Sequence, residues 1–220
     1  MNKHTEEAVV RQTAREYLQS THEEEFRIIR SKWRCNEGND CPDVHDVYAV
    51  ATDEAEVQVV LTLDFRQDPP KVTRDSYHQE QASLRVTRSL EQLIGSPDYL
   101  LKAYAQNPAI ALPQKPLMVK LYVLDRNKTS KEEVLEALKE LIMYASKNKF
   151  ELLDVEIAFF DGLPDKVTKE DFNLGSFTGE KTAFEKEYRF STWRFETGGK
   201  ELQEPDSLLN DPMKNIKTLN

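Results

Sequence analysis

The chain has 220 residues, a formal net charge of −9 and 31% charged side chains. This composition is typical of a globular protein, and the acidic balance argues against nucleic-acid binding, because phosphate contacts require a basic surface. The sequence contains no run of about 18 apolar residues, so we expect no membrane span. Two cysteines are too few for a disulfide-rich scaffold.

The first part of the chain, residues 1–106, is predicted to form helices and a β-meander. In chain order we expect a helix over 5–20, strands over 26–33, 44–51 and 57–65, and a helix over 75–94. Thr5 is expected to cap the first helix and Gly95 to end the second in a left-handed conformation. Pro69 and Pro70 are expected to end the sheet, and Ser96-Pro97 to start a short further helix.

Residues 107–116 contain three prolines, and we expect them to link two halves of similar size. The second half, 117–196, is predicted to contain a strand over 117–124, a helix beginning at Ser130, a strand over 153–159 and a final strand over 183–195. Ser130 and Glu133 have the spacing of a capping box. Residues 197–220 are expected to form a polar, loosely attached tail.

The pattern predicts an α+β fold. Apolar and polar residues alternate over 57–65 and 153–159, as in antiparallel sheets with one solvated face. We therefore expect antiparallel sheets with helices packed on one face. Tyr17 precedes a Phe26 strand much as Tyr144 precedes Phe150, which fits either a duplication or the composition that helix ends and strand starts share.

The densest group of special residues is Cys35, Cys41 and His45, with aspartates between them. The spacing is poor for zinc, since a fourth ligand is missing unless His22 contributes. A disulfide between Cys35 and Cys41 would require an oxidising compartment, and two ordinary thiols are the preferred alternative. A cysteine–histidine catalytic dyad is disfavoured, because the members of such dyads usually lie far apart in sequence.

Other motifs for chemistry are weak, and we predict no catalytic, cofactor-binding or metal-binding residues. Residues 179–182 end like a phosphate loop but lack its upstream glycine and its strand-to-helix setting. The carboxylate pairs Asp154/Glu156 and Glu185/Glu187 are expected on the solvent faces of strands, where charge discourages sheet aggregation.

The final predicted strand carries aromatic residues on both faces. Phe184, Tyr188 and Phe190 lie on one face, and Trp193 and Phe195 on the other. One set is a candidate partner surface, because exposed aromatic patches mark interaction sites. Burial of both sets, with the tail as cover, is the alternative.

The order of elements over residues 5–95 resembles small helix-plus-curved-sheet domains of the cystatin-like or NTF2-like kind. The pattern consists of a helix through Tyr17-Leu18, a charged turn, a strand from Phe26 and a meander ending in Asp75-Ser76-Tyr77. Such domains occur in uncharacterised bacterial proteins, including soluble parts of lipoproteins and immunity proteins. The resemblance brings no catalytic residues with it.

We expect a non-enzymatic, acidic binding module that recognises a protein partner through a sheet face or loop. Its net charge favours a basic partner by electrostatic steering. A small-molecule binder or enzyme using the concave side of a curved sheet is the main alternative, and a structural domain of an envelope assembly is a third. The protein is expected in the cytoplasm if Met1 is the native start, and outside it if a signal sequence once preceded Met1.

Overall fold

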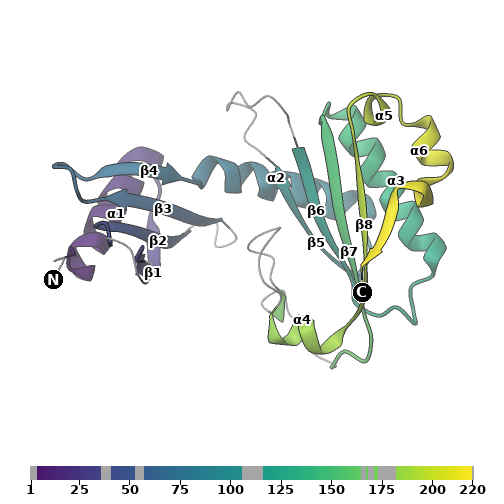
Figure 1. Ribbon diagram of the computed structural model, residues 1–220, viewed down its shortest axis with the longest axis horizontal. Helices are drawn as coiled ribbons and strands as arrows, with labels where there is room; N and C mark the ends of the chain where they lie inside the picture. The colour runs from purple at the N-terminus through teal and green to yellow at the C-terminus, as the bar shows by residue number, and fades with distance from the viewer. Residues whose placement is uncertain are drawn as a thin grey trace. The chain divides into compact units, whose positions relative to one another are not determined.

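The computed structural model describes residues 4–35, 41–52, 57–105, 116–164, 167, 171–172 and 182–219. The chain divides into two compact units, Met1–Gln81 (unit 1) and Ala82–Asn220 (unit 2), and the division falls inside helix α2 (Tyr77–Ile94). Each unit combines helices with one β-sheet, so the protein has an α+β fold (Figure 1). In the part of the chain described, no helix is long and apolar enough to cross a lipid bilayer.

Unit 1 is one helix packed on a four-stranded antiparallel sheet. Its elements are α1 (Glu7–His22), β1 (Phe26–Trp33), β2 (Val44–Ala51), β3 (Gln58–Asp64) and β4 (Lys71–Asp75), and the strand order is β1-β2-β3-β4. Helix α1 buries Val10, Ala14 and Leu18, because residues three to four apart share one face of a helix. The face of the sheet that contacts α1 supplies the other half of this core.

The structure confirms the three predicted strands of unit 1 and their antiparallel meander. Strand β4 is an addition, because the chain resumes pairing with β3 directly after Pro69 and Pro70. The prediction that Thr5 caps the first helix is wrong. Its backbone N–H and its hydroxyl donate instead to the carboxylate of Asp43, at 3.0 and 2.7 Å, so Thr5 ties the start of the chain to the sheet.

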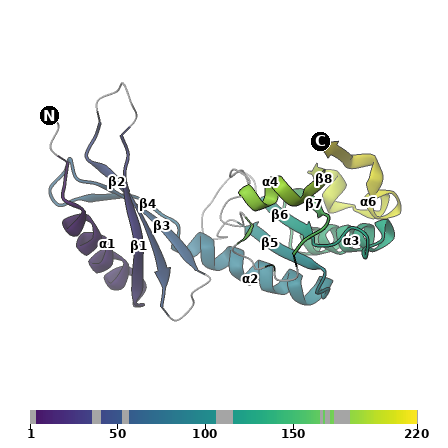
Figure 2. The same cartoon turned by 90° about the horizontal axis from the view of Figure 1, so that it is seen from below.

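Unit 2 is built on a five-stranded sheet with the order β5-β6-β7-β8-β9. Besides most of α2, its elements are β5 (Tyr99–Ala105), β6 (Pro116–Val123), α3 (Lys131–Lys147), β7 (Leu152–Phe160), α4 (Ala183–Tyr188), β8 (Arg189–Gly198), α5 (Lys200–Gln203), α6 (Asp206–Asn210), the 3-10 helix η2 (Pro212–Asn215) and β9 (Ile216–Leu219). Helices α2 and α3 lie on one side of the sheet and α4 lies on the other (Figure 2). The Ser130–Glu133 capping box and the left-handed Gly95 are both confirmed.

Part of the prediction for this sheet is wrong. Strands β6 and β7 pair in parallel, because α3 carries the chain back to the same end of the sheet, as a crossover helix does. The sheet is therefore mixed, while its other neighbouring strands are antiparallel. Strand β7 is also buried on both faces, since Asp154, Ala158 and Phe160 are inaccessible as well as the residues that face α3.

The predicted domain boundaries differ from those observed. Residues 106–115 lie outside the described residues, but β5 and β6 on either side of them are neighbours in one sheet. The proline-rich segment 107–116 therefore connects two strands of unit 2, and the boundary between units falls near Gln81. The units are also unequal in length. Ser96-Pro97 starts no helix and belongs to the turn that leads into β5.

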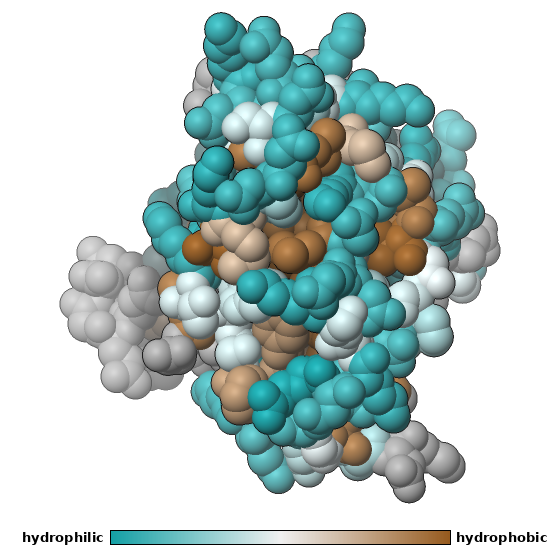
Figure 3. Space-filling view, turned by 90° about the vertical axis from the view of Figure 1, so that its right-hand side faces the viewer, coloured by the Kyte–Doolittle hydropathy of each residue, from teal (hydrophilic) through white to brown (hydrophobic). Residues whose placement is uncertain are grey.

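The prediction for residues 183–219 is confirmed only for the part that forms β8. Residues 183–195 form helix α4 and then β8, not one strand. The expected loose tail, 197–220, contains the end of β8, helices α5 and α6, η2 and β9, and it buries Leu202 and Leu208 in the main core of unit 2. Figure 3 shows the side of unit 2 near α5 and α6, where hydrophobic surface emerges in small groups between hydrophilic ones. This segment covers the core.

Candidate functional site

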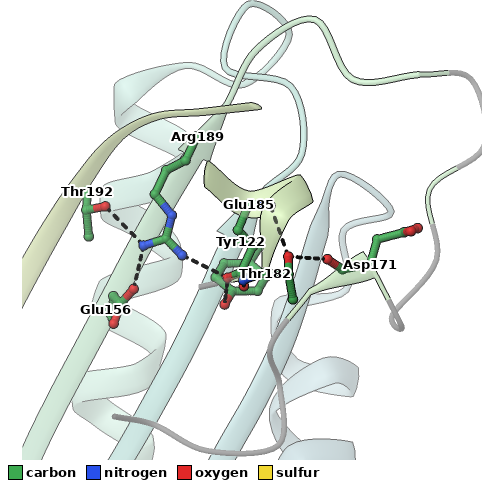
Figure 4. A network of polar contacts seen from close by, with 7 residues as sticks. All are labelled: Tyr122, Glu156, Asp171, Thr182, Glu185, Arg189 and Thr192. Atoms are coloured by element: carbon green, nitrogen blue, oxygen red, sulfur yellow. Dashed lines mark hydrogen bonds and ion pairs between the residues drawn. The ribbon is translucent and has the colours of Figure 1, made fainter. Parts of the chain in front are cut away.

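A group of charged and polar side chains comes together in unit 2, on the side of the sheet that carries α4 (Figure 4). Its members are Lys120 and Tyr122 on β6, Glu156 on β7, Glu185 on α4, and Arg189 and Thr192 on β8. Helix α4 presents Glu185 because a capping box with Thr182 fixes its first turn, with backbone-to-side-chain hydrogen bonds of 3.0 and 2.8 Å.

The guanidinium of Arg189 is the centre of this buried ionic network. Its two terminal nitrogens donate to Glu156 at 2.8 Å and to Glu185 at 2.9 Å, and the hydroxyl of Tyr122 donates to the same Glu185 oxygen at 2.5 Å. Glu185 is fully buried, and the side chain of Arg189 is 6% exposed. With Lys120, two buried cations face two carboxylates, so the network is balanced in charge.

Burial shifts the titration of two members of the network. Burial, reinforced by the hydrogen bond to Glu185, raises the pKa of Tyr122 far above its usual value, so the phenol stays neutral. Burial lowers the pKa of Lys120, although the carboxylates of Glu156 and Glu185 oppose this shift. Shifts of this kind occur at catalytic sites. Tyr122 and Glu185 are nonetheless fully buried and bonded to each other, so the network's evident role is to hold α4 on the sheet.

The expectation that the carboxylates of β7 and α4 are solvated is wrong for three of the four. Asp154 is buried and accepts two hydrogen bonds from Arg194, at 2.6 and 3.0 Å, while Glu156 and Glu185 belong to the ionic network. Glu187 alone of the four is exposed. Asp154, Glu156 and Glu185 therefore bind arginine side chains within unit 2 and do not form a solvated sheet edge.

A pocket of about 180 Å³ lies next to the network. It is lined by Glu185, Lys186, Arg189, Phe190, Ser191, Thr192 and Leu219. The Nε atom of Arg189 is buried and has no hydrogen-bond partner among the described residues. The pocket is smaller than the roughly 300–1,000 Å³ of typical small-molecule sites, so it gives little support to a small-molecule function.

The five aromatic residues of the predicted partner surface do not come together on one face. Phe184 and Tyr188 lie on α4 and pack against a second, smaller hydrophobic cluster, which consists of Tyr122, Ala158, Phe160 and Phe172. Phe195 is fully buried in the main core, and Trp193 is partly buried against Phe159 at 4.7 Å between ring centroids. Phe190 is 59% exposed, but the guanidinium of Arg126 lies 3.4 Å from its ring centroid.

The second candidate is the face of the unit 1 sheet that points away from α1. Because side chains alternate along a strand, β2 and β3 turn Val47, Ala49, Val59 and Leu61 toward the core and Tyr48 and Val60 outward. The exposed cations on this outer face are Arg27, Arg30 and Lys32 of β1, and Lys71 and Arg74 of β4. We call these five residues the cationic face.

The strand register gives the cationic face a regular arrangement. One row across the four strands runs Lys32, Asp46, Thr62, Arg74, and the next runs Arg30, Tyr48, Val60. The guanidinium of Arg30 lies 4.1 Å from the ring centroid of Tyr48. Cations therefore occupy the two edge strands and largely neutral side chains occupy the centre.

The two carboxylates on the outer face already have arginine partners. Arg34 bonds to Asp46 at 2.7 Å, and Arg66 bonds to Asp64 at 2.6 and 2.9 Å. The hydrogen bonds that Arg66 donates are the main reason that the pKa of Asp64 is lowered to about 2. Within the described residues, the members of the cationic face form no ion pair of their own, so the face carries a local positive charge on a chain whose net charge is −9.

The cysteine and histidine cluster is structural. Cys35 and Cys41 are joined by a disulfide with their Cα atoms 4.6 Å apart, and His45 bonds to Asp43 at 2.9 Å. The preferred prediction of two ordinary thiols is therefore wrong, and so is the zinc alternative, because the two sulfurs are bonded to each other. Across the described ranges, no three histidine, cysteine, aspartate or glutamate side chains are grouped as metal ligands.

His22, the other histidine considered for that cluster, lies at the end of α1, away from the cysteines in sequence. Its Nε2 bonds to Asp75 at 2.8 Å, and its ring stacks on Tyr77 with 4.0 Å between centroids. Nδ1 is buried without a hydrogen-bond partner in the described part of the chain. The carboxylate can only accept, so Nε2 carries the proton and His22 joins α1 to the end of β4.

These features define an α+β protein with a paired, buried ionic network in unit 2 and an open cationic face in unit 1. No protein-family model and no curated protein matches the sequence. Among solved structures, the chain is similar to a DUF5037 family protein from Ruminococcus gnavus ATCC 29149, with a TM-score of 0.54, 12% sequence identity, and coverage of 89% of this chain and 99% of that one. At this identity the likeness concerns the fold alone.

Proposed function

We propose that the protein is a non-enzymatic binding module that recognises a partner protein through the cationic face of unit 1. The observation that carries the proposal is the concentration of five exposed cations on one sheet face that α1 leaves open. Exposed cations that form no ion pair within the fold contribute little to its stability. Such a face is favourable when a partner of complementary charge binds to it.

An enzymatic function has less support. Tyr122 and Lys120, whose pKa values burial perturbs, belong to a network whose carboxylates and cations already bond to one another. A catalytic group must come within hydrogen-bond distance of its substrate. The small pocket beside Arg189 is the remaining candidate site, and its volume suits a small ion better than an organic substrate.

We also propose that the protein works in an oxidising compartment. The disulfide between Cys35 and Cys41 supports this location, because cytoplasmic thiol buffers keep most cysteines reduced. Thiol alkylation of the protein as isolated, followed by mass spectrometry, tests it. The proposal predicts no alkylated cysteine before reduction and two after it, whereas two alkylated cysteines at the outset would refute it.

The binding proposal is tested by photo-cross-linking from defined positions in the producing cell. A photoreactive residue replaces Gln58, which is exposed on the outer face at the start of β3, or Gln19, which is exposed on α1. We expect a discrete protein adduct from position 58, competed by excess unlabelled protein, and a much weaker one from position 19. Equal adducts from both positions, or none from position 58, would contradict the proposal.

A further inference from the structure

We propose that the occupant of the cationic face is an acidic segment of a partner polypeptide, a claim that rests on the proposed function and specifies its ligand. Charge complementarity is the first argument. All five residues of the cationic face are exposed, and the face's own carboxylates, Asp46 and Asp64, are already held by Arg34 and Arg66. Among the residues that the structure describes, an incoming carboxylate therefore meets these cations without an unpaired carboxylate on the face to compete with it.

The spacing of the charges is the second argument. Neighbouring strands are about 4.8 Å apart, so Lys32 on β1 and Arg74 on β4, in the same row, are separated by three intervals, or about 14 Å. An extended chain advances about 3.3–3.6 Å per residue. An extended segment of the partner that runs across the four strands can therefore place one acidic residue at Lys32 and another, about four positions along, at Arg74.

The centre of the face specifies the middle of the segment. Tyr48 and Val60 are half-buried and form the row next to the one that joins Lys32 to Arg74, whose own central members are Asp46, held by Arg34, and Thr62. Neither Tyr48 nor Val60 carries a formal charge, and the ring of Tyr48 offers the flat apolar area that interface residues commonly supply. The fitting segment consequently has acidic residues at its two ends and, where it passes over the adjacent Tyr48 and Val60, apolar residues between them.

A polypeptide fits these features better than a nucleic acid or an anionic membrane. Proteins that bind single strands combine a basic groove with several stacking aromatics, whereas the central aromatic here, Tyr48, already has Arg30 over its ring. A long polyanion or an anionic bilayer would also meet the remainder of an acidic chain with a net charge of −9. A short segment that contacts the face alone avoids that repulsion.

The test uses the full-length protein and a fluorescent peptide of seven residues, with two glutamates at each end and three apolar residues between. The triple variant Arg30→Glu, Lys32→Glu, Arg74→Glu reverses the charge on the face. The control Arg15→Glu, Lys131→Glu, Lys147→Glu makes the same change in net charge at exposed helix positions. We expect the face variant to weaken binding roughly tenfold or more, and the control about twofold or less.

A glutamine version of the peptide, an oligothymidylate and phosphatidylglycerol vesicles are measured in parallel. Binding of the glutamate peptide that weakens with salt and exceeds the other three supports the proposal. Three results would overturn the proposal. They are equal losses of binding in the face and control variants, no binding of the glutamate peptide, and tighter face-dependent binding of the oligonucleotide or the vesicles. The emission of Trp33 reports whether the triple variant folds, and the single variants Arg30→Glu and Arg74→Glu replace it if it does not.

Failure of this inference is distinguishable from failure of the proposed function. An identified partner protein cross-linked at position 58, together with no binding of the acidic peptide, would leave the binding function in place and overturn the acidic ligand. Absence of both would overturn both.

Discussion

The two units treat charge on a β-sheet in opposite ways. In unit 2, the side of the sheet that carries α4 holds the buried side chains of Lys120 and Arg189 beside Glu156, which forms an ion pair with Arg189. In unit 1, the outer face of the sheet leaves cations such as Arg30 and Arg74 exposed and without an ion pair among the described residues. In each unit, a helix precedes three strands that pair antiparallel: β1–β3 follow α1, and β7–β9 follow α3.

Charged residues therefore have different roles in the two units. A buried and balanced network stabilises the fold only while every member is present, because removing one leaves an unpaired buried charge. An exposed, unbalanced face contributes little to stability and is available to a partner. Substitutions in unit 2 should therefore affect folding, and substitutions on the cationic face should affect binding.

The largest effect is expected from Glu185→Gln in unit 2. The variant keeps the shape of the side chain but leaves Arg189 and Lys120 facing the single carboxylate of Glu156, so we expect a loss of about 3 kcal/mol in the free energy of unfolding. Each unit contains one of the two tryptophans, so the fluorescence of Trp193 in a Trp33→Phe background reports unit 2 by itself.

The exposed neighbour Glu187 provides the matched control. Glu187→Gln removes the same charge from the same helix and should change the unfolding of unit 2 by no more than about 0.5 kcal/mol. Equal effects of the two substitutions would show that the ionic network does not stabilise α4.

A smaller loss is expected from His22→Ala in unit 1. It removes the hydrogen bond to Asp75 and the stacking on Tyr77, so we expect a loss of about 2–3 kcal/mol. Urea unfolding followed through Trp33 in a Trp193→Phe background measures it. His78→Ala, which changes an exposed histidine beside it, is the control, and a similar loss in both variants would contradict the assigned role of His22.

Removal of the disulfide should cost about 2 kcal/mol in unit 1, since its two cysteines are only six positions apart and such a short loop restrains few conformations of the unfolded chain. The variant Cys35→Ser, Cys41→Ser, unfolded in urea and followed through Trp33, measures this. Unchanged unfolding of the double variant would show that the disulfide does not stabilise unit 1.

The smallest effect is expected from the pH dependence of Asp64. Its pKa is about 2 in the folded protein, below its ordinary value of 3.8, because of Arg66. Its stabilisation is therefore present above about pH 4 and is lost as the pH falls through 2. Arg66 is largely exposed, so solvent limits the effect to the range of about 0.2–1 kcal/mol for surface pairs.

The variant Asp64→Asn should reduce the decline in unit 1 stability between pH 4 and pH 2, as followed through Trp33. A decline as steep as that of the wild-type protein would show that other carboxylates cause it.

Local patterns in the sequence predicted much of the fold. Alternation over 57–65 and the apolar stripe that follows Ser130 sufficed for β3 and α3, because their periodicity matches the element that buries them. The α+β class followed from these elements. The resemblance to cystatin-like or NTF2-like domains remains a prediction.

The errors arose where a distant contact decides the local structure. The aromatic residues of 183–188 suggested a strand, whereas the Thr182–Glu185 capping box starts a helix there; that spacing was visible in the sequence. The burial of Glu185 was not, because it depends on Tyr122 and Arg189 from other elements. The cationic face was missed because net charge hides how Lys32 and Arg74, far apart in sequence, fall into one row of the sheet.

The most direct test compares the triple face variant Arg30→Glu, Lys32→Glu, Arg74→Glu with Glu185→Gln, by the partner adduct at position 58 and by unfolding of each unit. We expect the face variant to lose the adduct while both units unfold as in the wild-type protein. We expect Glu185→Gln to keep the adduct while unit 2 unfolds at lower denaturant. An adduct that survives reversal of the face, or disappears in Glu185→Gln while unit 1 remains folded, would contradict the account.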